Sequence, residues 1–189
     1  MEEILRPLRH EDIEMVRTWR NSEGVAQYMY TAEPITPEQQ EAWFQSVRQD
    51  ASKEYWIITS GGKDIGVANL YAINRAARTC YWAFYIAEQG VRGSGIGGKV
   101  EFAVLDYVFN TLKLNKLLCE VFVDNDKVIS MHEKFGFRRE SYFREHILKD
   151  GKFKDVVGLA MLQREWAQVR EAMRSRVFRT AAPATDAPA

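Results

Sequence analysis

The sequence predicts a mixed α/β fold in a single domain, and three patterns support this. Residues 10–21 and 36–49 near the start, and 164–178 near the end, repeat apolar side chains at helical spacing. A run of short β-rich segments fills residues 55–86. Strand and helix patterns then alternate until a closing hairpin at residues 137–162, which is typical of a domain that packs helices on a sheet.

The N-terminal third is expected to hold one strand and two helices. Residues 4–8 read as a short strand, and the helical segment 10–21 ends in turn-forming residues. Residues 25–30 form a second short apolar segment. The stretch 36–39 combines an N-cap threonine, a proline at the first helical position and a glutamine at the third. We therefore expect a helix from there to about residue 49.

Hairpin and cap signals divide the rest of the chain. Gly61-Gly62 joins two β-rich segments, Gly136 ends a short helix, and Asp150-Gly151 joins the last two strands. The expected strands are 55–59, 64–71, 79–86, 116–123, 137–149 and 152–162, and the expected helices are 99–111, 128–134 and 164–178.

Composition and charge narrow the function classes. The 26 basic and 26 acidic side chains balance, which gives no electrostatic case for binding nucleic acid or an anionic membrane. The charged N-terminus lacks the apolar core of a signal peptide, and no apolar run approaches the length of a membrane span. Cys80 and Cys119 are isolated in strand-like segments, so we expect reduced buried thiols and no metal site. These features indicate a cytoplasmic protein.

The sequence also predicts the bounds of the domain and the character of its C-terminal end. Residues 1–179 are expected to form the single domain, and the Ala/Pro-rich residues 180–189 a disordered tail. The last helix carries five arginines between Arg164 and Arg179. A solvated basic face is the default interpretation, and docking of a second subunit in a homodimer is the alternative.

The most informative segment is a glycine-rich loop between a strand and a helix. Five of the nine residues from Gly90 to Gly98 are glycine. Glycine lets the backbone adopt positive φ and approach a ligand closely, and the first turn of a helix presents unpaired N–H groups at its positive end. The loop therefore suits a diphosphate, with Arg92 and Lys99 as added positive charge.

Three other interpretations of this loop compete. A nucleotide-triphosphate P-loop fails because Val100 follows Gly98-Lys99, where that motif needs serine or threonine. Residues 93–98 match the G-x-G-x-x-G pattern of a dinucleotide-binding loop. They follow antiparallel strands, however, and Asp124 at the end of the next strand is farther along the chain than the acid of that motif. A glycine turn that binds nothing is the third.

Two motifs together resemble the GNAT superfamily of N-acetyltransferases. Arg92-x-x-Gly95-x-Gly97 resembles its acetyl-CoA signature, Gln/Arg-x-x-Gly-x-Gly/Ala. Residues 125–137 resemble its Asn-x-x-Ala-x-x-x-Tyr-Glu-Lys-x-Gly-Phe element at the matching spacing. The resemblance implies a mostly antiparallel central sheet with two splayed parallel strands and flanking helices. It also implies acetyl-CoA as co-substrate, a small-molecule amine as acceptor and no metal.

The resemblance also implies where the coenzyme lies. The loop amides hold the pyrophosphate, and the pantetheine arm and acetyl group lie along the end of a strand where two parallel strands part. The implied coenzyme-binding residues are Phe84, Tyr85, Ile86, Val91, Arg92, Gly93, Ser94, Gly95, Ile96, Gly97 and Asn125.

Two residues are candidates for proton transfer. Glu120 lies among apolar residues on the strand that leads to Asn125, and we expect it to act as the base through a water molecule. The alternative is a surface carboxylate. His132 stands where the family usually has the tyrosine that protonates the leaving thiolate, and histidine can do this near neutral pH. The alternative is a histidine that only packs on its helix.

The acceptor is inferred from a wider resemblance. Segments 5–8, 19–21, 28–30, 118–121 and 147–156, with the helix around residues 43–44, resemble one branch of the family. This branch acetylates a UDP-4-amino-4,6-dideoxy sugar in pseudaminic acid synthesis for flagellin glycosylation. The implied substrate-binding residues are Arg20, Asn21, Met29, Tyr30 and Tyr81. Relatives that acetylate protein N-termini or polyamines share parts of the pattern, and a non-catalytic acyl-CoA-binding module remains a third hypothesis. Arg20 alternatively pairs with an acid such as Glu23.

Overall fold

The computed structural model describes residues 4–31, 33–91 and 93–178. The proposed tail 180–189 and Arg92 lie outside these ranges. Seven strands form one sheet in the order β1-β2-β3-β4-β5-β7-β6. The strands are β1 (Leu5–Pro7), β2 (Glu54–Ser60), β3 (Lys63–Asn74), β4 (Thr79–Ile86), β5 (Lys116–Phe122), β6 (Arg138–Lys149) and β7 (Lys152–Leu162).

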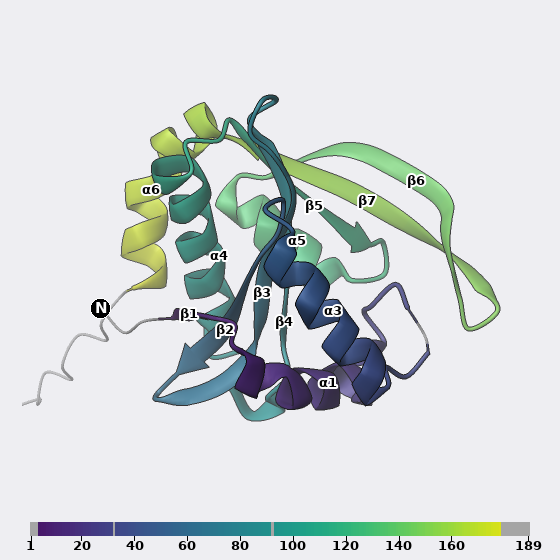
Figure 1. Ribbon diagram of the computed structural model, residues 1–189. Helices are drawn as coiled ribbons and strands as arrows, with labels where there is room; N and C mark the ends of the chain where they lie inside the picture. Colours follow the sequence, from purple (N-terminus) through teal and green to yellow (C-terminus); the bar gives the residue numbers. More distant parts are fainter. Residues whose placement is uncertain (1–3, 32, 92, 179–189) are drawn as a thin grey trace, which may run out of the picture.

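Helices cover both faces of the sheet (Figure 1). The α-helices are α1 (Ile13–Asn21), α2 (Glu23–Ala26), α3 (Pro37–Gln49), α4 (Ile96–Asp106), α5 (Asp126–Phe135) and α6 (Gln163–Val177). Short 3₁₀ turns η1 (His10–Asp12) and η2 (Gln89–Val91) precede α1 and α4, and a π-helical turn η3 (Tyr107–Thr111) follows α4. Within the described ranges, no helix is both long and apolar enough to cross a bilayer.

The two faces of the sheet have separate cores. Ile57 and Ile58 are neighbours on β2 and point to opposite faces, as alternate residues of a strand do. Ile57 packs with Val16 of α1 and Trp43 of α3, on what we call the α1–α3 face. Ile58 belongs to the larger cluster, which α4, α5 and α6 cover, on what we call the α4–α5 face.

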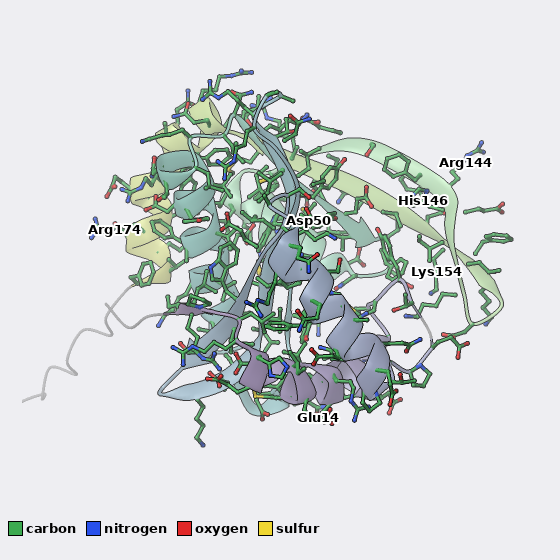
Figure 2. The ribbon with its side chains drawn as sticks, in the orientation of Figure 1. Glu14, Asp50, Arg144, His146, Lys154 and Arg174 are labelled. Atoms are coloured by element: carbon green, nitrogen blue, oxygen red, sulfur yellow. The ribbon has the colours of Figure 1, made fainter. Side chains whose placement is uncertain are left out.

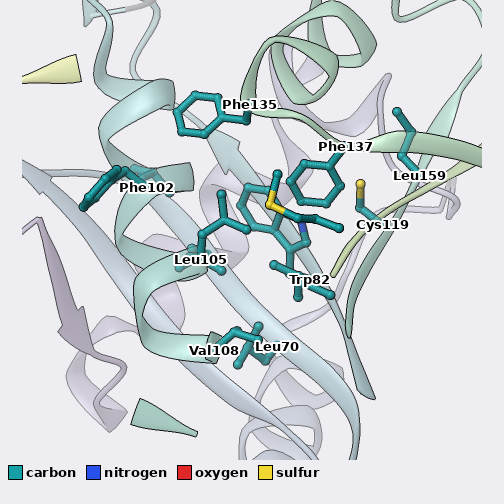
Figure 3. Packing of buried hydrophobic residues seen from close by; sticks show 14 of the residues in the cluster. Leu70, Trp82, Phe102, Leu105, Val108, Cys119, Phe135, Phe137 and Leu159 are labelled. Atoms are coloured by element: carbon teal, nitrogen blue, oxygen red, sulfur yellow. The ribbon is translucent and has the colours of Figure 1, made fainter. Parts of the chain in front are cut away.

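The larger core includes both cysteines. Cys80 and Cys119 are free and buried, as the sequence predicts. Figure 3 shows Cys119 close to Phe137 and Trp82 in this core, and the rings of Trp82 and Phe137 are 6.5 Å apart.

One pair of strands is parallel and all other neighbours are antiparallel. The parallel ladder between β4 and β5 runs only from Thr79–Lys116 to Tyr81–Leu118. β5 pairs with β7 over its full length on the other side. The mostly antiparallel sheet with one short parallel pair is the fold that the sequence predicts.

Two expected elements differ in detail. The helix after the glycine loop starts at Ile96 rather than residue 99, because Gly95 at φ +84° turns the chain into the helix directly. Its last residues form the π-turn η3. The short apolar segment at residues 25–30 contains the end of α2 (Glu23–Ala26), which the turn signal at residues 21–24 concealed.

The β6–β7 hairpin extends beyond the helices (Figure 1). Arg144, His146 and Lys154 stand on it, far from Glu14 on α1 (Figure 2).

At the tip of this hairpin the Lys149 side chain is buried. Its Nζ donates to the carbonyl oxygen of Ala26 at 2.6 Å and to that of Met29. The hairpin therefore fixes the segment that follows α2.

The close approach of β3 to β4 gives a test of the fold. A Cβ on Gly66 would lie 2.1 Å from the Tyr85 carbonyl oxygen, so Gly66→Ala must push β4 away. We expect Gly66→Ala to lower the free energy of unfolding by about 1–3 kcal/mol or more, measured by urea denaturation. A Cβ on Gly90 would meet nothing within 4 Å, so Gly90→Ala is the control and should be nearly neutral. Equal stability of the two variants would contradict this packing.

Candidate active site

The glycine loop ends as an open cradle at the start of α4. Gly93 and Gly95 have φ of +85° and +84°, a conformation that side chains disfavour, and nothing lies within 4 Å of where their Cβ atoms would be. Gly95 is the N-cap of α4, and no side chain caps the helix there. The first turn of α4 thus begins at a glycine without a side-chain cap, and the unpaired N–H groups at the positive end of a helix suit a diphosphate.

The back of the loop is packed against the core. The Ser94 hydroxyl donates to the Val91 carbonyl at 2.6 Å, and Val91 packs against the larger core. A Cβ on Gly97 would lie 3.3 Å from the Met131 sulfur and 3.9 Å from the Phe84 ring. The loop, the end of β4 and α5 thus meet at Gly97.

The parallel ladder ends beside this loop, and we call the point where β4 and β5 stop pairing the fork. The last pair is Tyr81–Leu118, and Trp82 and Cys119 are the next residues along each strand. Trp82 and Cys119 are buried on the α4–α5 face. On the opposite face Ala83 is exposed between Tyr81 and Tyr85, which leaves room for a ligand.

Glu120 lies on the open side of the fork. It follows Cys119 on β5 and so points to the α1–α3 face. The Tyr30 hydroxyl donates to Glu120 Oε2 at 3.0 Å, and the Tyr30 ring packs 5.2 Å from that of Phe122. Burial raises the pKa of Tyr30, and the charge of Glu120 raises it further. Tyr30 therefore stays a hydrogen-bond donor to the carboxylate.

Two more tyrosines line the same side. The Tyr71 and Tyr81 rings stack 5.3 Å apart at 29°. Burial raises the pKa of Tyr71, followed by the charge of Glu120, which places the Tyr71 phenol near that carboxylate. The structure thus brings the predicted residues Tyr30, Tyr81 and Glu120 together.

Arg20 is a half-buried cation with spare hydrogen-bonding capacity. Its Nη2 donates to the Thr31 hydroxyl at 3.1 Å. Its Nη1 and the Tyr85 hydroxyl are both buried, and neither has a hydrogen-bond partner in the described part of the chain. Burial lowers the pKa of Arg20, and the nearby Tyr85 and Tyr55 partly offset this. Glu23, which the sequence offered as an alternative partner of Arg20, is not among these contacts.

Asn21 and Met29 have local structural contacts. The Asn21 side chain donates to the Ile35 carbonyl at 2.9 Å and accepts from the Ile35 N–H at 2.8 Å. Both polar ends of Asn21 are thus bound to the chain that leads into α3. Met29 supplies its carbonyl to Lys149. A direct contact of either side chain with substrate stays a prediction.

His132 is buried at the closed side of the fork. It is 3% exposed, and its Nδ1 lies 2.7 Å from Oε1 of Glu101, which is fully buried on α4. Its ring meets that of Trp82 edge-on at 5.3 Å. Burial alone lowers the pKa of His132, but the adjacent Cys119 and Glu101 outweigh it, so the pKa is raised. Burial raises the pKa of Glu101, and the charge and hydrogen bond of His132 partly offset this.

Asn125 stands at the far end of β5, where α5 begins. It is the N-cap of α5, with its carbonyl accepting from the N–H groups of Val128 and Ile129. Its side chain makes no capping bond. Among the described residues, no group of three or more His, Cys, Asp or Glu side chains is arranged to hold a metal ion.

Sequence reasoning missed four residues of this site: Glu101, Tyr71, Phe122 and Lys149. Glu101 stands at a helix position that reads as ordinary surface charge, and Lys149 stands beside a turn. The only local signal was the apolar company of Glu101, between Val100 and Phe102. A carboxylate between apolar residues of a helix is expected to be buried, and a buried carboxylate needs a hydrogen-bonding partner from another element.

Comparisons with known proteins identify the family and its relatives. The family model for the acetyltransferase (GNAT) domain matches residues 4–138. The chain is similar to a spermidine N(1)-acetyltransferase of Vibrio cholerae, 26% identical over 164 residues that cover 86% of this chain and 94% of that protein. It is also similar to the acetyltransferase PseH of Campylobacter jejuni, 28% identical over 69% of this chain and 79% of that protein.

A solved structure shares the fold. The spermidine N-acetyltransferase from Vibrio cholerae in complex with CoA and spermine superposes with a TM-score of 0.80 and 24% identity. The match covers 86% of this chain and 96% of that one.

The cradle gives a prediction for coenzyme binding. Gly95→Ala places a Cβ in the left-handed region at the mouth of α4, so we expect the Kd for coenzyme A to rise about tenfold or more by calorimetry. Gly62→Ala, at φ +74° in a distant hairpin, is the matched control. Both variants should lose similar stability, about 1 kcal/mol. Unchanged coenzyme affinity in Gly95→Ala would exclude this loop as the cradle.

Proposed function

The chain belongs to the GNAT acetyltransferase family, and we propose that its acceptor is the 4-amino group of a UDP-4-amino-4,6-dideoxy sugar. It is an acetyl-CoA-dependent N-acetyltransferase. The product of the proposed reaction serves pseudaminic acid synthesis and flagellin glycosylation. The relative PseH of Campylobacter jejuni supports this branch, since it covers 69% of this chain.

The observation that carries the proposal is the buried Nη1 of Arg20, which has no hydrogen-bond partner among the described residues. Burying part of a charge without a counter-charge costs free energy, and an anionic ligand removes this cost. The Tyr85 hydroxyl is a second buried donor without a partner in that part of the chain, and it stands on β4, the strand of Ala83 and Tyr81. A diphosphate accepts such charge-assisted hydrogen bonds, and the tyrosines offer flat faces to a base or sugar.

Residues on the two sides of the fork have different roles in the proposed reaction. Acetyl-CoA supplies an activated thioester when it is bound. The cradle at Gly93–Gly97 holds its diphosphate, and the end of β4 lines the acetyl group. Glu120, oriented by Tyr30, accepts a proton from the attacking amine through water. Positioning of amine and thioester supplies much of the remaining rate enhancement.

A polyamine is the second candidate acceptor. The Vibrio cholerae relative that covers 86% of this chain is a spermidine acetyltransferase. A polycation would however meet the positive charges of Arg20 and Lys149 on this side, with Glu120 as the carboxylate at the fork. Protein N-terminal amines are a weaker alternative, and binding of acyl-CoA without turnover is the non-enzymatic one.

Release of the CoA thiol with a panel of amines separates these acceptors. We expect turnover with the UDP-4-amino sugar and at least 100-fold lower kcat/KM with spermidine or an N-terminal peptide, since an unmatched buried charge costs several kcal/mol. Faster release with spermidine supports the polyamine reading, and CoA binding without release supports the binding module. Either of these results rejects the sugar acceptor.

The role of Arg20 is tested by Arg20→Gln. Removing a charge-assisted hydrogen bond to a phosphate costs about 1.5–3 kcal/mol, so we expect the KM for the sugar nucleotide to rise about 10- to 100-fold. The KM for acetyl-CoA should not change. Arg48→Gln, which alters an exposed arginine on α3, is the control. A rise in both KM values would point to general damage rather than to lost acceptor binding.

The pair of Tyr30 and Glu120 gives a graded test. We expect Glu120→Gln to lower kcat about 10²- to 10⁴-fold, because the general base is lost. Tyr30→Phe removes only its hydrogen bond and should lower kcat by no more than about 10-fold. Steady-state kinetics across pH measures both. Comparable losses in the two variants would mean that Glu120 is not the base.

A further inference from the structure

The buried pair of Glu101 and His132 is not explained by core packing. Both side chains are almost fully buried, and Glu101 Oε2 has no partner within the described ranges. Taking a carboxylate and an imidazolium out of water costs several kcal/mol per ion, and a well-packed apolar pair of similar volume usually serves the core as well. The pair therefore calls for a functional explanation.

The position of the pair indicates what it acts on. The His132 ring meets Trp82 of β4 edge-on, and Cys119 of β5 lies close enough to raise the pKa of His132. These are the first residue of each strand beyond the last parallel pair, so His132 lies directly at the fork. Met131, its neighbour on α5, backs the glycine loop at Gly97. His132 thus stands where the thioester end of the coenzyme lies in the proposed reaction.

The fork also separates this histidine from the base. Cys119 and Glu120 are consecutive on β5 and point to opposite faces. The imidazole is therefore on one side of the fork, and the carboxylate that takes the proton from the amine is on the other. The amine adds to the thioester carbonyl and the thiolate leaves from the resulting tetrahedral intermediate, so the base and the acid act on two different atoms and can stand on different sides of the fork.

We propose that Glu101 is a positioning residue that keeps His132 protonated at the fork, so that the imidazolium stabilises and protonates the leaving CoA thiolate. Glu101 binds Nδ1 from the side of α4, which orients the rest of the ring toward Cys119 and the fork. In the step, Glu120 accepts the proton of the amine as the carbon–nitrogen bond forms. His132 gives its proton to the sulfur, which keeps the electron pair of the broken carbon–sulfur bond, and is reprotonated from solvent.

Few other groups control the charge on His132. In the described part of the chain, the titratable groups that face the ring are Glu101 from α4 and Cys119 from β5, while Trp82 and Phe137 are uncharged neighbours. Burial lowers the pKa of His132, but Cys119 and the Glu101 carboxylate together raise it above its unfolded value. Without that carboxylate, burial favours the neutral ring, and the proton is lost at lower pH.

The first test needs no acceptor. Glu101→Gln keeps the volume and one hydrogen bond but removes the charge. In the free protein we expect the nitrogen NMR shifts of His132 to report a protonated ring at pH 7 in wild type. In Glu101→Gln its pKa should fall by about 1–3 units. In the complex with CoA, the ultraviolet absorbance of the thiolate should show that the bound thiol is more acidic than free CoA. Glu101→Gln should raise its pKa by about 1 unit or more.

The second test restores the phenol that related enzymes carry. The double variant carries Glu101→Leu and His132→Tyr. Its phenol is a neutral acid that needs no carboxylate partner, so we expect its kcat to lie within about tenfold of the wild-type value. The matched pair Glu101→Leu with His132→Phe has the same packing without a hydroxyl and should stay about 10²-fold slower. In Glu101→Gln, kcat should decline at lower pH than in wild type, with an unchanged KM for acetyl-CoA.

A neutral His132 at pH 7 in the wild-type protein overturns the proposal. So does a bound-thiol pKa that is the same in wild type and Glu101→Gln, and so does equal recovery by the tyrosine and phenylalanine double variants. The proposal rests on the acetyltransferase assignment but not on the acceptor. The histidine and bound-thiol measurements use the free protein and CoA alone, so failure of the sugar panel leaves them unaffected.

Discussion

The site depends on the early end of one parallel ladder. β4 and β5 pair only as far as Tyr81 and Leu118, and each strand continues without the other. Because side chains alternate along a strand, the next residues on β5, Cys119 and Glu120, face opposite sides of the same opening. One side leads to the helices α4 and α5, and the other leads to the tyrosines of the α1–α3 face. The fold thereby sets two chemically different environments around one point.

This separation has an electrostatic consequence. A carboxylate and an imidazolium on the same side would attract each other, and at about 4 Å with an effective dielectric of about 20 that attraction is about 4 kcal/mol. A direct pair of Glu120 and His132 would satisfy both groups at once and turn them away from the amine and the sulfur. The sheet instead gives them separate partners, Tyr30 for Glu120 and Glu101 for His132.

The sequence predicted the features that are encoded locally. The capping box at Thr36 and Gln39, the helix end at Gly136 and the glycine cradle each depend on a few adjacent residues, and all three are present. The unpredicted contacts join residues far apart in the chain: Glu101 and His132 are 31 residues apart, Tyr30 and Glu120 are 90, and Met29 and Lys149 are 120. Periodicity reports which face a residue takes, but it carries no information on which distant side chain it meets.

Long-range contacts of this kind also bear on the acceptor. Lys149 reaches from the β6–β7 hairpin to the carbonyls of Ala26 and Met29, and Tyr30 follows directly and binds Glu120. The hairpin tip therefore sets the position of the tyrosine that donates to Glu120. Lys149 and Arg20 bring positive charge to the same region, where Asp150 attracts Lys149 and Arg20 repels it. The proposed sugar nucleotide carries a negative group that would relieve the repulsion between the two cations, whereas a polycation would add to it. The proposal of an anionic acceptor therefore rests on the same charges that hold the loop in place.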